Sequence, residues 1–124
     1  MRTKILLVED DPFLRELYSD VLTNEGYKVD QAADGEEGLQ KIKEGGYDIV
    51  LLDILVAKVS GIDIMKNIKV HPPKNPNKLT IFFTNLDDPS QIKEALKLGD
   101  ACLIKSQITP AILVSKIKSL LAKS

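Results

Sequence analysis

Three carboxylates stand side by side near the N-terminus, directly after a short apolar run. The run is Ile5–Val8, and Glu9, Asp10 and Asp11 follow it. Neighbouring carboxylates repel, and each raises the pKa of the others unless a cation lies between them. Oxygen ligands without histidine or cysteine favour a hard ion such as Mg²⁺ over zinc. These acids therefore predict a metal site.

Three later apolar runs also end in residues that can do chemistry. Asp53 closes "DIVLLD", Thr84 is near the end of "TIFFTN", and Lys105 closes "ACLIK". An aspartate can act as a nucleophile and form an acyl phosphate. An ammonium group and a hydroxyl group can hold phosphoryl oxygens, one by charge and one by hydrogen bonding. The set predicts metal-assisted phosphoryl transfer to Asp53.

These residues must be brought together by the elements that carry them. Short apolar runs alternate with one-sided helical patterns, and the runs cover residues 5–8, 28–32, 49–52, 79–83 and 101–104. Five such βα units predict a parallel sheet covered by helices on both faces. Ligands of such sheets bind outside the carboxyl ends of the strands, where all the residues above should meet. The second run is more polar and predicts an edge strand.

Helix starts are marked by capping side chains. Three positions combine a capping residue with a proline at the first helical position: Asp11-Pro12, Asp88-Pro89 and Thr109-Pro110. Asp34 and Glu37 have the spacing of a capping box. Asp11 is therefore interpreted as a helix cap rather than a metal ligand. The segment from Lys69 to Lys78 contains three prolines and predicts a long surface loop.

The length and composition fit one soluble globular domain. The chain has 124 residues and a net charge of −1, which favours neither nucleic acid nor an anionic membrane as a partner. No apolar run approaches the roughly 20 residues of a membrane span, and the N-terminus is no signal peptide. The single cysteine, Cys102, excludes an internal disulfide. Together these features predict a cytoplasmic location.

Four strings carry a resemblance to a known family: "ILLVEDD", "DIVLLDILVAKVSG", "FFTN" and "ACLIK". In this order and spacing they resemble the motifs of response-regulator receiver domains of two-component signalling, of the chemotaxis-regulator kind. The resemblance implies a flavodoxin-like (βα)5 three-layer sandwich with sheet order 2-1-3-4-5. It also implies that residues 1–124 form one receiver domain.

The resemblance assigns a role to each site residue. Asp53 would accept the phosphoryl group, with Thr84 as the switch hydroxyl and Lys105 as the phosphate contact. The domain would catalyse only its own phosphoryl transfer and dephosphorylation. A histidine kinase or phosphotransfer protein would supply the phosphoryl group, and an output partner would read the result. The Mg²⁺ ligands would be the carboxylates of Glu9, Asp10 and Asp53 and the main-chain carbonyl of Leu55.

Four positions depart from the family pattern. Ala57 replaces a common proline, which predicts a looser loop after Asp53. Asn85 replaces a small residue and narrows access to Asp53. Cys102 stands where many relatives have an aromatic switch residue. Ser106 replaces a proline that often follows a cis bond, and because a non-proline cis bond costs about 3 kcal/mol, a trans bond or visible strain is expected there.

Two further leucines bear on the lifetime of the acyl phosphate. In the family, the side chains two residues after the phosphoacceptor and two after the switch hydroxyl flank the path of the attacking water. Here they are Leu55 and Leu86, which cannot orient a water by hydrogen bonding. The sequence therefore predicts slow loss of the phosphoryl group.

Other functions are compatible with parts of the pattern. A degenerate receiver would keep the fold as a phosphorylation-independent binding module, an alternative that the departures at Ala57, Asn85 and Cys102 motivate. A flavodoxin-like electron carrier would need a phosphate loop after the first strand, where the acids would repel the FMN phosphate. A phosphatase of related topology would use an early aspartate as nucleophile, whereas the downstream residues here centre on Asp53.

Overall fold

The sheet is parallel, and its strand order determines which strand ends are neighbours. The computed structural model describes residues 2–85 and 88–123. Five strands pair in the order β2-β1-β3-β4-β5 and all pairs are parallel. The predicted order 2-1-3-4-5 is confirmed. The strands are β1 (Lys4–Val8), β2 (Lys28–Ala32), β3 (Ile49–Asp53), β4 (Leu79–Thr84) and β5 (Ala101–Ile104).

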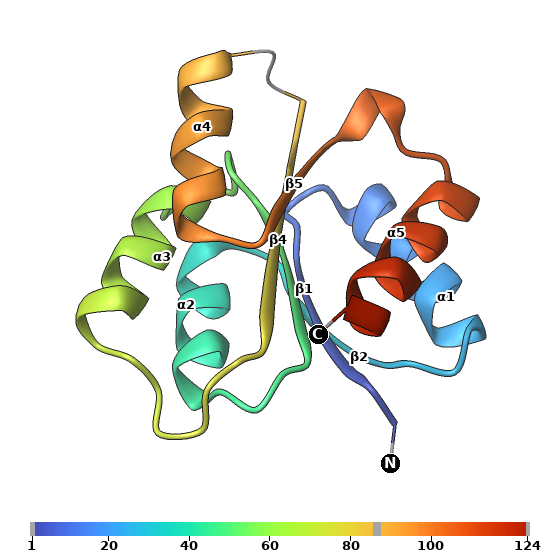
Figure 1. Cartoon of the computed structure of the whole chain (residues 1–124), viewed down its shortest axis with the longest axis horizontal. Coiled ribbons are helices and arrows are strands. Elements are labelled where there is room, and N and C mark those ends of the chain that lie inside the picture. The colour runs from blue at the N-terminus through green and yellow to red at the C-terminus, as the bar shows by residue number, and fades with distance from the viewer. Residues whose placement is uncertain (1, 86–87, 124) are drawn as a thin grey trace.

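Helices cover both faces of the sheet and make three layers. In Figure 1, α2, α3 and α4 lie on one side of the strands, and α1 and α5 lie on the other. A short 3₁₀ helix, η1 (Lys105–Gln107), follows β5. The flavodoxin-like sandwich predicted from the sequence is confirmed. The helices are α1 (Pro12–Asn24), α2 (Gly35–Glu44), α3 (Gly61–Val70), α4 (Pro89–Leu98) and α5 (Pro110–Lys123).

Two apolar clusters hold the layers together, one on each face of the sheet. One joins Leu6, Val50 and Phe82 to the helices α2, α3 and α4, and the other joins alternate strand residues to α1 and α5. All five residues of β3 are buried, as expected for a strand covered on both faces. β2 is at the sheet edge and is only partly buried, as its polar sequence predicts.

The helix caps follow the predicted side chains. Asp11 Oδ1 accepts hydrogen bonds from the amides of Phe13 (2.9 Å) and Leu14 (3.4 Å), so its interpretation as a cap is confirmed. Asp34 Oδ1 accepts from the Glu37 amide at 2.9 Å. Glu37 returns a bond to the amide of Ala33 (2.7 Å), the residue before the cap, rather than to the cap itself. Asp34 thus satisfies a main-chain donor that the first turn of α2 leaves unpaired, and Glu37 binds the chain just before the cap.

The predicted proline-rich loop is shorter than expected and is firmly anchored. α3 includes Lys69 and Val70 and ends just before His71, which precedes the first proline, because proline and the residue before it do not continue a helix. The amide of Gly46 donates to the carbonyl of Asn75 at 2.9 Å. Gly45 has a φ of 74°, and a Cβ there would lie 1.8 Å from that same carbonyl oxygen. Glycine is therefore required where this loop crosses the end of α2.

Within residues 2–85 and 88–123, none of the helices combines the length and apolar character needed to span a bilayer.

Candidate functional site

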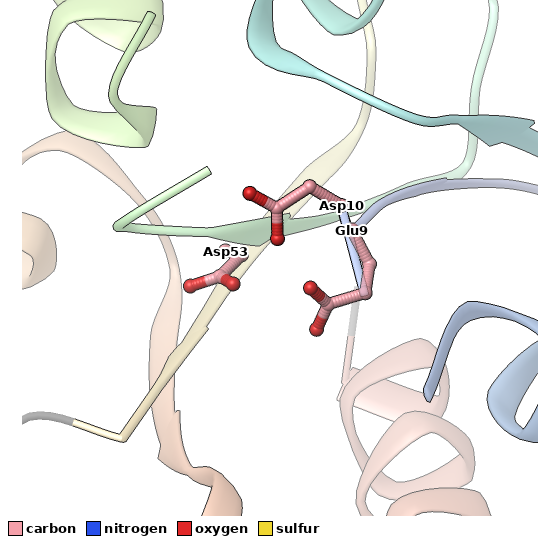
Figure 2. A group of neighbouring side chains, drawn as sticks. All are labelled: Glu9, Asp10 and Asp53. Atoms are coloured by element: carbon pink, nitrogen blue, oxygen red, sulfur yellow. The ribbon is translucent and has the colours of Figure 1, made fainter. Parts of the chain in front are cut away.

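Three carboxylates meet at the carboxyl edge of the sheet. Asp53 is the last residue of β3, and Glu9 and Asp10 directly follow the neighbouring strand β1. One oxygen from each of the three lies within 4.8 Å of the others (Figure 2). In the part of the chain that the structure describes, this is the one group of three or more such ligands. The sequence-predicted acids are therefore brought together.

Lys105 reaches into the acid cluster from the end of β5. Its Nζ lies 2.5 Å from Glu9 Oε1 and 2.8 Å from Asp53 Oδ2. All three side chains are almost fully buried, with 8%, 1% and 7% of the Lys105, Glu9 and Asp53 side chains exposed. The ammonium group also lies 5.0 Å from the centre of the Phe83 ring. The ring face is attractive to a cation, so Phe83 forms part of the floor beneath Lys105.

Burial and mutual attraction govern the protonation states of Glu9 and Lys105. Burial raises the pKa of Glu9, and the hydrogen bonds from Lys105 and the Asp11 amide offset only part of that rise. Burial alone would lower the pKa of Lys105, but its hydrogen bonds to Asp53 and Glu9 outweigh burial and raise it. Lys105 therefore stays charged at neutral pH. One ammonium group faces three acids, which leaves the cluster short of positive charge.

Main-chain and arginine contacts fix the direction of the acids. The amide of Asp11 donates to Glu9 Oε2 at 3.1 Å, and the amide of Leu55 donates to Asp53 Oδ1 at 3.1 Å. Arg15 Nη1 donates to the main-chain carbonyl of Glu9 at 2.9 Å. Sequence reasoning missed Arg15; its place in the first turns of a helix that follows the acids is the signal that could have found it.

Thr84 and Leu55 are the other predicted site residues. Thr84 is fully buried at the end of β4. Its partner on the neighbouring strand β5 is Ile104, and the residue before it, Phe83, pairs with Asp53 of β3. Thr84 thus lies at the same sheet edge as the acids and close to the end of β5, which Lys105 directly follows. Leu55 has 56% of its surface exposed. Leu86, paired with Leu55 in the prediction about water access, lies outside the described residues, so that shielding stays a prediction.

The four positions that depart from the family pattern have different surroundings in the structure. In the loop after Asp53, the Ala57 amide donates to Asp10 Oδ2 (2.9 Å) and the Ala57 carbonyl accepts from the Gly35 amide (2.8 Å), and the looser loop stays a prediction. Asn85 is exposed. Cys102 is half-buried against the core on the α2–α4 face. The described chain contains no cis peptide bond, so the bond between Lys105 and Ser106 is trans, as expected.

The donor set suits a hard divalent cation. Every side-chain donor in the cluster is a carboxylate oxygen, and no histidine or thiol competes. Mg²⁺ prefers one or two such carboxylates and retains waters. The excess negative charge and the oxygen-only donors therefore fit Mg²⁺.

Comparison with known proteins identifies the class. The family model of the response regulator receiver domain matches residues 5–118. The chain belongs to this family of two-component signalling domains. Its acid cluster and flavodoxin-like fold agree with that membership.

Similarity to individual proteins supports the same family membership. The chain is 32% identical over 119 residues to the chemotaxis protein CheY of Thermotoga maritima, covering 94% of this chain and 96% of that one. It is 37% identical over 123 residues to the transcriptional regulatory protein CpxR homolog of Haemophilus influenzae, covering 98% of this chain and 52% of the relative. A CheY-like receiver domain from Methanospirillum hungatei superimposes with a TM-score of 0.87 at 28% identity, covering 99% and 96% of the two chains. The transcriptional regulators among the curated relatives are much longer, and the chain spans about half or less of their length.

Proposed function

We propose that Asp53 accepts a phosphoryl group from a histidine kinase or phosphotransfer protein in a Mg²⁺-dependent reaction, and that the domain then switches conformation. The observation that carries the proposal is the position of the Asp53 carboxylate. It lies among the acids Glu9 and Asp10 and 2.8 Å from the Lys105 ammonium group. A nucleophilic carboxylate thus has cation ligands on one side and a fixed positive charge on the other.

The proposed ligands of Mg²⁺ are the carboxylates of Glu9, Asp10 and Asp53 and the carbonyl of Leu55. When bound, the metal supplies positive charge to the oxygens of the transferring phosphoryl group. The reaction forms a bond between an Asp53 oxygen and phosphorus while the bond from phosphorus to the donor's imidazole nitrogen breaks. Lys105 is placed to follow the charge, because its ammonium group already contacts a carboxylate oxygen of the proposed nucleophile.

Thr84 and Lys105 are the proposed link between chemistry and switching. Lys105 would exchange a carboxylate partner for a phosphoryl oxygen, and the Thr84 hydroxyl would donate to another. These groups lie at the ends of β4 and β5. Their movement would change the surface offered to an output partner in the cytoplasm. Neither nucleic acid nor membrane is proposed as a partner of this domain.

The test is direct phosphorylation. Acetyl phosphate with Mg²⁺ should add the mass of one phosphoryl group to the intact protein, and chelation of the metal should prevent it. Asp53→Ala should remain unlabelled, whereas Asp63→Ala, on exposed α3 surface, should be labelled like the unmodified protein. Equal labelling of Asp53→Ala would remove the assignment of the phosphoacceptor.

A second candidate is a phosphorylation-independent binding module. The replacements at Ala57, Asn85 and Cys102 motivate it, because each departs from the residue that the family pattern has at that position. The same experiment separates the two. A protein that gains no phosphoryl mass under conditions that label a chemotaxis regulator would be a binding module.

A further inference from the structure

The main chain of Ala57 lies between the acid cluster and α2. Its N–H donates to Asp10 Oδ2 at 2.9 Å, and its carbonyl accepts from the Gly35 amide, the first residue of α2, at 2.8 Å. The Ala57 side chain itself is exposed. Any role of this residue therefore belongs to its main chain.

Asp10 depends on this amide more than its neighbours do. Lys105 pairs with Glu9 and Asp53, and both of these also accept a main-chain hydrogen bond nearby. Among the described residues, the hydrogen bond from Ala57 is the one polar contact of the Asp10 carboxylate. The Ala57 N–H is thus what restrains this acid when no cation is bound.

The main chain that follows Ala57 packs on the start of α2. Lys58, the next residue, has a φ of 75°, which is rare outside glycine. Its Nζ lies 3.2 Å from Asp34 Oδ2 and 3.9 Å from Glu36 Oε2, at the start of α2. Gly35 packs so closely on the loop that a Cβ there would lie 2.0 Å from the Val59 carbonyl oxygen. These contacts anchor the main chain that follows Ala57 on the start of α2.

We infer that the main-chain amide of Ala57 is a positioning group for Asp10 in divalent-cation binding, and that it links the cation site to the start of α2. The inference rests on the metal site of the proposed function. Figure 2 shows one Asp10 oxygen directed toward Glu9 and Asp53. The hydrogen bond from the Ala57 N–H to Asp10 Oδ2 restrains the carboxylate in this orientation. Groups that orient a metal ligand in this way typically contribute 10- to 100-fold to affinity.

The experiment compares cation affinity in variants of the full chain, with Mg²⁺ measured by calorimetry and Mn²⁺ by paramagnetic relaxation. Ala57→Pro removes the N–H, and replacing Ala57 by lactic acid removes it as a main-chain ester without the proline ring. Both should bind about tenfold more weakly than the unmodified protein. Ala57→Ser keeps the amide on an exposed position and should stay within about twofold. The ester variant preserves the test if the proline variant does not fold.

Two further measurements distinguish positioning from general damage. On an Asp10→Asn background, the ester should change Mn²⁺ affinity by less than twofold, because the carboxylate that it orients is gone. In NMR titrations with Mg²⁺, the Gly35 amide signal should shift in the unmodified protein and shift less in the ester variant. Equal cation affinity in the ester variant and the unmodified protein would overturn the inference alone. Absence of divalent-cation binding by the unmodified protein would instead overturn the proposed metal site.

Discussion

Lys105 carries most of the electrostatic compensation at the site. Two unit charges of like sign 4.8 Å apart repel by about 3 kcal/mol at an effective dielectric constant of 20. Three acids contain three such repulsions, and one ammonium group contacts only Glu9 and Asp53. Asp10 is more exposed, so water relieves part of its share. The remaining charge imbalance is the physical reason that a divalent cation should bind.

Replacing Asp10 by asparagine tests this balance at the level of one residue. Asp10→Asn should weaken Mg²⁺ binding by more than tenfold, because it removes a proposed carboxylate ligand. It should also raise the free energy of unfolding of the metal-free protein by about 1 kcal/mol, because one repulsive charge is removed. Thermal unfolding with a chelator should show a midpoint a few degrees higher. An unchanged or lower midpoint would show that repulsion among these acids does not limit stability.

The sequence predicted the side chains of the site better than its main-chain contacts. Glu9, Asp53 and Lys105 were identifiable because each follows an apolar run and the ends of parallel strands meet at one edge. Lys105 contacts Glu9 as well as Asp53 because its side chain is long enough to reach both, and the spacing of residues along the sequence does not reveal this. The Ala57 amide has no signal at all, since every residue except proline carries the same N–H group.

Elements with local determinants were predicted to within a residue or two. Asp11 and Asp34 cap helices because their side chains satisfy amides only two or three residues away. The end of α3 was placed too early, because the helix continues through Lys69 and Val70 until the prolines begin. The anchoring of the following loop depends on contacts with the end of α2, which no short stretch of sequence encodes.

Asp48 shows how one carboxylate joins several elements. It precedes β3, and its Oδ2 accepts from the Lys4 amide at the start of β1 at 2.8 Å. Its Oδ1 lies 3.1 Å from Lys78 Nζ, next to the start of β4. The hydrogen bond from Lys4 lowers the pKa of Asp48, and the lysine side chain of Lys78 adds to the effect.

This lowered pKa predicts a specific loss of stability in acid. The ionised form is favoured in the folded state, so its contribution is complete above the unfolded pKa of about 4 and disappears as pH falls through the lower folded pKa. Asp48→Asn should reduce the free energy of unfolding by about 1 kcal/mol at neutral pH, and the two proteins should converge at low pH. Denaturant titrations from pH 7 to pH 2 measure the difference. Asp20→Asn, on the exposed surface of α1, controls for the change in net charge. If the difference in stability between Asp48→Asn and the unmodified protein persisted unchanged at pH 2, the lowered pKa of Asp48 would not be its cause.

Across the whole molecule, the site lies against the elements proposed to respond to it. Phe82, two residues before Thr84, belongs to the same apolar cluster as Ala95 of α4, and Leu98 of α4 and Cys102 of β5 pack against that cluster. A Cβ on Gly99, at the end of α4, would lie 2.8 Å from the Phe82 ring. The end of α4 is therefore in direct contact with the strand that carries Thr84. β2 and α2 lie toward the opposite edge of the sheet.

This arrangement predicts which elements should change conformation on phosphorylation. With Cys102 in place of a large aromatic, the response should be carried mainly by the main chain after Thr84 and by α4, and should reach β5 and α5. A ligand inverts a 1:99 population when it favours one state by about 5.5 kcal/mol, which is within reach of a few charge-assisted hydrogen bonds. Amide exchange and NMR shifts measured with and without beryllofluoride, a phosphoryl mimic, should change most in these elements, and Asp53→Asn should abolish the change. Phosphoryl-dependent shifts confined to β2 and α2 would contradict this direction of switching, even if Mg²⁺ alone perturbs Gly35 through Ala57.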